Sequence, residues 1–167
     1  MRLPMKLLVL SVGLSLALAA SGTAQTPKPL LEEKERVGTG PNLRGLTVLV
    51  VDDEPDAREI ISTMLEQYGA DVKSAGSVSQ AFDILLHGSP HVLVSDIGMP
   101  ENDGYELIRQ IRSRGIQIPA VAVTAHAMIE DRLRALSAGY QVHVAKPVDS
   151  VELGIVVASL AGLAKRS

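Results

Sequence analysis

The chain has 167 residues, of which 46% are hydrophobic, and its formal net charge is −3. This length allows one domain with a substantial core plus an appendage. The absence of cysteine excludes a disulfide scaffold and cysteine-based metal sites or nucleophiles. Without a strong basic excess we expect no nucleic-acid partner.

The first 24 residues have the layout of a secretory signal peptide or a membrane anchor. Arg2 and Lys6 precede an apolar run, Leu7–Ala20, and small residues follow it. No charge occurs between Lys6 and Lys28, so a membrane anchor is possible, but only through residues 7–27. The next stretch contains prolines and a run of charges, which is typical of a linker. The predicted organisation is an appendage at 1–24, a linker at 25–43 and one folded domain at 44–165.

From Leu43 onward, strand and helix patterns alternate along the chain. Leu46–Val51 is a continuous aliphatic run, as expected for a strand covered on both faces. Apolar residues then recur every three or four positions until Gly69, which predicts an amphipathic helix. Later strands are predicted from Val72, at Val92–Ser95, within Ile118–Ala125 and at Val142–Ala145. Later helices are predicted at Val78–Leu86, around Leu107–Ile111, at Met128–Ala138 and at Val151–Leu163.

Five strands alternating with five helices predict an α/β fold. Parallel neighbours need crossover helices, and crossovers of one hand place helices on both faces of the sheet. The predicted fold is therefore a (βα)5 flavodoxin-like three-layer sandwich with a doubly wound five-stranded parallel sheet. In such sheets ligands bind beyond the carboxyl ends of the strands.

Polar side chains follow four of the five predicted strands. Asp52 and Asp53 follow the first strand and Asp96 the third, while Thr124 and Lys146 follow the fourth and fifth. Crowded carboxylates repel one another, and Mg²⁺ suits a site built from a few carboxylates, carbonyls and waters. A cation there would stabilise a phosphoryl group in transfer, and an aspartate can form an acyl phosphate.

Four segments resemble the receiver domain of two-component response regulators, of the chemotaxis-regulator-like, single-domain or hybrid-kinase type. They are "LVVDDEPDAR", "VLVSDIGMPENDGYEL", "VAVTAHA" and "HVAKPVD", and the resemblance extends from Leu43 to about Leu163. It implies that Asp96 accepts a phosphoryl group from a phosphohistidine of a histidine kinase or a phosphotransfer domain. Such a module switches or relays a signal, and as an enzyme it catalyses at most its own phosphorylation and dephosphorylation.

The resemblance also assigns roles to the residues around Asp96. It implies a Mg²⁺ site made of Asp53, of Asp52 largely through water, of Asp96 and of the backbone carbonyl of Gly98. Lys146 would pair with Asp96 and then with the phosphoryl group, Thr124 would move to hydrogen-bond that group, and the Lys146–Pro147 bond would be cis.

Three positions depart from the usual receiver pattern. His143 lies where many relatives carry Tyr or Phe as a rotamer switch coupled to Thr124, so its readout surface would be more polar. Gly98 and His126 occupy positions that tune dephosphorylation in this family, and Gly98 contributes no side chain there.

Other functions remain open at this stage. The alternative within the same fold is a pseudo-receiver that is never phosphorylated and acts as a docking module. A flavodoxin-like cofactor binder would need a Ser/Thr/Gly-rich loop after the first strand, where the chain has Asp-Asp-Glu. A phosphatase of the haloacid dehalogenase type would need a second aspartate at Gly98. The apolar last helix also leaves pairing with a partner or a second copy open.

The expected compartment conflicts with the N-terminus. Transfer of phosphate from an ATP-driven kinase favours the cytoplasm, whereas residues 1–24 read as an export signal. A start codon assigned too far upstream, an inverted anchor and genuine export of a repurposed domain are the three explanations.

Overall fold

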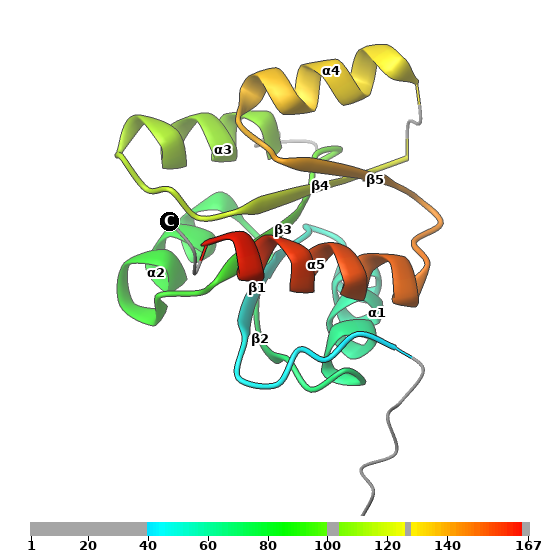
Figure 1. The fold of residues 1–167 in the computed structure, drawn as a ribbon. Coiled ribbons are helices and arrows are strands. Elements are labelled where there is room, and N and C mark those ends of the chain that lie inside the picture. Colours follow the sequence, from blue (N-terminus) through cyan, green and yellow to red (C-terminus); the bar gives the residue numbers. More distant parts are fainter. Residues whose placement is uncertain (1–39, 100–103, 126–127, 165–167) are drawn as a thin grey trace, which may run out of the picture. The chain divides into compact units, whose positions relative to one another are not determined.

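The computed structural model describes residues 40–99, 104–125 and 128–164, in which five strands alternate with five helices (Figure 1). The elements are β1 (Thr47–Val51), α1 (Pro55–Glu66), β2 (Asp71–Ala75), α2 (Val78–Gly88), β3 (Val92–Asp96), α3 (Gly104–Ser113), β4 (Ala120–Thr124), α4 (Ile129–Ala138), β5 (Val142–Ala145) and α5 (Ser150–Ala164). The predicted alternation is confirmed, with element ends displaced by a few residues. Met128, for example, precedes α4 and does not belong to it.

All five strands are parallel and form one sheet in the order β2-β1-β3-β4-β5. The chain moves outward from β1 to β2 and then crosses back to β3, so strand order reverses between β1 and β3. Helices α1 and α5 pack on one face, and α2, α3 and α4 pack on the other. This arrangement confirms the predicted doubly wound, flavodoxin-like sandwich.

The central strands contribute aliphatic side chains to two separate layers of the core. In β1, Val48 and Val50 pack toward α1 and α5, while Leu49 and Val51 pack toward α2 and α3. All four are completely buried, as are the corresponding residues of β3 and β4. Burial on both faces explains the continuous apolar runs in the sequence and fixes the strand ends on a rigid support.

The predicted signal-peptide-like segment, residues 1–24, and nearly all of the predicted linker lie outside the described residues. Among the helices that the structure does describe, none combines the length and the apolar character needed to cross a membrane.

Candidate functional site

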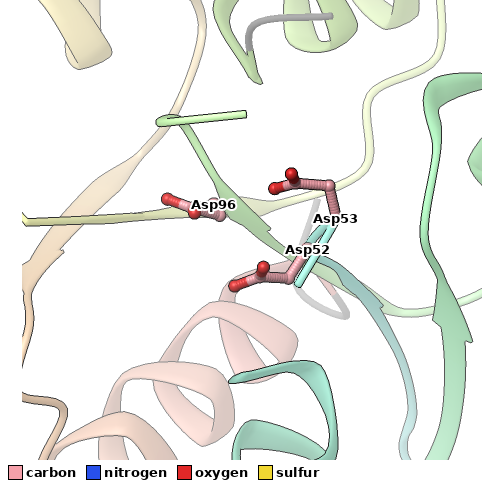
Figure 2. Close-up of side chains that lie close together, drawn as sticks. All are labelled: Asp52, Asp53 and Asp96. Atoms are coloured by element: carbon pink, nitrogen blue, oxygen red, sulfur yellow. The ribbon is translucent and has the colours of Figure 1, made fainter. Parts of the chain in front are cut away.

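Three aspartates converge at the carboxyl edge of the sheet, where strand order reverses. Val51 is opposite Ser95 in the parallel register, so Asp52, directly after β1, lies beside Asp96 at the end of β3. One carboxylate oxygen from each of Asp52, Asp53 and Asp96 lies within 4.8 Å of the other two (Figure 2). Two adjacent strands therefore bring together the three acids that the sequence placed at strand ends.

The three carboxylates differ in their environments. Asp52 is completely buried and Asp96 is 9% exposed, whereas Asp53 faces solvent. Burial raises the pKa of Asp52, although the backbone N–H of Glu54 and the ammonium of Lys146 oppose this effect. That N–H donates to Oδ1 of Asp52 at 2.9 Å. Asp52 is thus held in place at an electrostatic cost.

Lys146 extends from the loop after β5 and bridges two of these acids. Its Nζ lies 3.1 Å from Oδ2 of Asp96 and 3.3 Å from Oδ2 of Asp52. Burial alone would lower the pKa of Lys146, but the hydrogen bond and charge of Asp96, followed by those of Asp52, raise it above its ordinary value. One ammonium group does not balance the negative charge of three carboxylates, and the candidate metal ligands are all oxygen atoms. These residues fit a small, hard divalent cation such as Mg²⁺.

Two further predicted residues lie at the same edge. The backbone N–H of Gly98 donates to Oδ1 of Asp96 at 3.0 Å, which turns the chain over the carboxylate. Thr124 ends β4 and is 2% exposed, and its carbonyl accepts from the backbone N–H of Lys146 at 2.7 Å. The Lys146–Pro147 bond is cis, as the resemblance implied.

His143 lies in the middle of β5, on the sheet face opposite α5. Its neighbours Val142 and Val144 pack toward α1 and α5, so the imidazole faces the layer of α3 and α4. Nε2 of His143 is buried and has no hydrogen-bond partner in the described part of the chain. His126, the other predicted tuning residue, lies outside the described residues.

Sequence reasoning missed two neighbours of the site. Nη1 of Arg58, in α1, donates to the backbone carbonyl of Asp52 at 2.6 Å. Gly104 begins α3 so close to β3 that an added Cβ would lie 2.8 Å from Cα of Ile97 and closer still to the carbonyl oxygen of Asp96. A basic residue one turn into α1 was a sequence signal for Arg58, whereas Gly104 follows Asn-Asp, a pattern that is typical of a turn.

The buried carboxyl of Asp52 is expected to make metal-free stability depend on pH. Because its pKa is raised above the ordinary 3.8 in the folded state, the folded protein holds this proton more strongly, and ionisation opposes folding as pH rises through that window. The melting temperature of Asp52→Asn, relative to wild type in EDTA, should therefore increase as the pH rises above about 4. Thermal unfolding followed by circular dichroism measures this difference. A difference that does not change with pH contradicts the expectation.

The fold and site together define the receiver class of flavodoxin-like folds: an order β2-β1-β3-β4-β5, acids after β1 and β3, and a lysine after β5. The family model of the response regulator receiver domain matches residues 48–158. The chain therefore belongs to the response regulator receiver domain family, and as such is a receiver domain of two-component signalling. Receiver domains are signalling modules, which disfavours the flavin-binding and phosphatase alternatives.

Similar proteins differ in the share of their own length that the match covers. The chain is 45% identical over 113 residues to a 14.6 kDa protein in the sodA1 3′ region of Leptolyngbya boryana, covering 66% of this chain and 86% of that protein. It is 36% identical over 118 residues to the response regulator Rre1 of Synechocystis, covering 69% of this chain and 51% of Rre1. The receiver domain of the Francisella response regulator 1452 superposes with a TM-score of 0.68 at 28% identity, covering 71% of this chain and 98% of that one. The chain thus spans about half the length of Rre1.

Proposed function

We propose that Asp96 is the phosphoacceptor of this receiver domain and takes its phosphoryl group from a phosphohistidine of a histidine kinase or a phosphotransfer domain. The observation that carries the proposal is the bridge from Lys146 to Asp96 and Asp52, with Asp53 in the same cluster. Asp52, Asp53, Asp96 and the carbonyl of Gly98 are the proposed ligands of Mg²⁺.

In the proposed transfer, a carboxylate oxygen of Asp96 forms a bond to phosphorus as the phosphorus–nitrogen bond of the donor breaks. The donor imidazole leaves with the electron pair of that bond. Bound Mg²⁺ supplies charge neutralisation for the phosphoryl oxygens. Lys146, already 3.1 Å from Asp96, donates a charge-assisted hydrogen bond to the transferring group. Thr124 is proposed to hydrogen-bond the group once it is attached, and His143 to change rotamer with it.

Incubation with acetyl phosphate and Mg²⁺ is expected to add one phosphoryl group to the wild-type protein, because a small donor tests the acceptor without its kinase. Intact-mass spectrometry measures the gain, which hydroxylamine should reverse because the product is an acyl phosphate. Asp96→Ala should show no gain, whereas Asp71→Asn, on the exposed edge strand β2, should behave as wild type. An unchanged wild-type mass, or the same gain in Asp96→Ala, rejects the proposal and favours the docking-module alternative.

The proposed function also implies a kinase partner and a cellular compartment for this domain. Part of the sensor histidine kinase RcsC of Salmonella typhimurium is 35% identical to this chain over 121 residues, which supports a kinase-linked role for such a domain. The proposal assigns the domain, at the predicted bounds 44–165, to the cytoplasm, where ATP-driven kinases act. N-terminal sequencing of the protein from its native cell tests the conflicting reading of residues 1–24.

A further inference from the structure

Arg58 ties the loop that carries two of the acids to a packed helix. Its Nη1 donates to the backbone carbonyl of Asp52 at 2.6 Å, and charge-assisted hydrogen bonds of this kind are strong. The helix is anchored in the core by Ile61 and Leu65, which are 4% and 0% exposed. The guanidinium thus connects the backbone between Asp52 and Asp53 to a helix that is packed into the core.

The loop is held from a second side by the end of β2. The backbone N–H of Asp52 donates to the carbonyl of Ala75 at 3.2 Å. The next residue, Gly76, leaves space for Arg58: an added Cβ would lie 3.0 Å from Nη1 and 3.5 Å from Cζ. Gly76 does not have a positive φ, so what an added side chain would affect here is the close approach of the guanidinium, which would have to shift by a few tenths of an ångström.

Arg58 acts on the carboxylates through the backbone. Within the part of the chain that the structure describes, it forms no ion pair with a carboxylate, and its short contact is with the carbonyl of Asp52. Both peptide groups that flank Asp52 are therefore fixed by partners from other elements, Ala75 and Arg58. The directions of the Asp52 and Asp53 side chains follow from the orientation of these peptides.

We propose that Arg58 is a positioning residue that aligns Asp52 and Asp53 for a divalent cation, with Gly76 providing the space for its guanidinium. This inference rests on the proposed function, because it assigns a cation to the same acids. Two effects of removing Arg58 have opposite signs. Loss of a nearby positive charge would tighten cation binding, whereas loss of alignment would weaken it. The direction of the change therefore separates positioning from simple electrostatics.

Arg58→Ala is expected to weaken Mn²⁺ binding by about tenfold or more, the usual range for residues that orient metal ligands. Titration with Mn²⁺, followed by the electron paramagnetic resonance signal of the free ion, measures the affinity directly. Arg58→Lys keeps the positive charge and a nitrogen that can donate to the carbonyl of Asp52, so its affinity for Mn²⁺ should lie between those of Arg58→Ala and wild type. In the metal-free protein, faster hydrogen exchange of the Glu54 amide, which donates to Oδ1 of Asp52, should accompany the loss.

Arg112→Ala is the matched control. The Arg112 guanidinium also donates to backbone carbonyls, Gly139 at 2.8 Å and Ile116 at 2.9 Å, but at the amino ends of β4 and β5, the opposite edge of the sheet. Its loss should lower the melting temperature and leave the affinity for Mn²⁺ unchanged. A general effect of destabilisation would weaken binding in both variants and would overturn the inference.

Gly76→Ala provides a second test that leaves Arg58 in place. The added methyl should shift the guanidinium by a few tenths of an ångström and weaken Mn²⁺ binding less than Arg58→Ala does, and the double variant with Arg58→Ala should be no weaker than Arg58→Ala alone. An Arg58→Ala affinity equal to or tighter than wild type overturns the inference while the proposed function stands. A wild-type protein that binds Mn²⁺ but takes no phosphate from acetyl phosphate overturns the proposed function alone.

Discussion

Replacing Lys146 by alanine is expected to slow phosphorylation of Asp96 by acetyl phosphate by about 100- to 1,000-fold at saturating Mg²⁺. The ammonium is held between Asp96 and Asp52 before any donor arrives, so its charge needs no rearrangement when the phosphoryl group reaches the carboxylate. Preorganised donors aimed at developing charge contribute effects of this size. The initial rate of mass gain, measured over a series of donor concentrations, gives the comparison.

Lys73→Ala controls for the loss of a lysine as such. Lys73 lies on the edge strand β2, pairs with Asp71 and is half-exposed. Its removal should leave the rate unchanged. Lys146→Arg should recover little activity, because a planar guanidinium cannot occupy the place of a compact ammonium between two carboxylates. A Lys146→Ala rate within about threefold of wild type would contradict the electrostatic role.

Gly104→Ala is expected to destabilise the domain by about 3 kcal/mol or more, as overpacking against a rigid backbone does at the upper end of its range. The added methyl would meet the carbonyl of Asp96, the last residue of a strand buried on both faces, and Cα of Ile97, which directly follows it. The hydroxyl of Tyr140 donates to the carbonyl of Gly104 at 2.7 Å, which restrains the start of α3 from the other side. Urea unfolding at equilibrium measures the loss.

The sign of this effect is what makes Gly104 informative. Within a helix, alanine is intrinsically more favourable than glycine by about 1 kcal/mol, so propensity alone predicts that Gly104→Ala stabilises the protein. Gly162→Ala tests that baseline in α5, because an added Cβ there meets nothing within 4 Å. We expect Gly162→Ala to stabilise the domain by about 0.5 to 1 kcal/mol. A stabilising Gly104→Ala would show that α3 can move away from β3.

The pattern of apolar residues along the chain predicted the helices and strands well, because the same relation between burial and sequence recurs in each strand–helix unit of this fold. Runs such as Leu46–Val51 are apolar on both faces, and this occurs where helices cover a parallel sheet on both sides. The residues that follow such runs then lie at one edge of the sheet, which is why the sequence alone predicts Asp52, Asp96 and Lys146 as site residues. The β2 strand gave a weaker signal, since three of its five residues are exposed at the edge of the sheet.

Contacts that depend on close approach of backbones could not be predicted in this way. Gly104 follows Asn-Asp and has the signature of a turn, but its importance comes from the distance between α3 and β3. Arg58 has the appearance of an ordinary helix-surface cation, yet it binds a carbonyl in the preceding loop. Neither distance is encoded in the spacing of residues along the chain. Pairing of Lys146 with Asp52 as well as Asp96 was likewise absent from the prediction.

The position of each site residue in the sheet divides the site into a stable part and a labile part. Asp52 directly follows β1 and Asp96 ends β3, both interior strands hydrogen-bonded on both sides, whereas Lys146 follows β5, which pairs with β4 alone. Edge strands open at lower free energy than interior ones. Transient fraying of β5 would therefore withdraw Lys146 and His143 together while the aspartates keep their geometry, so loss of the counter-charge precedes any loss of the acid cluster.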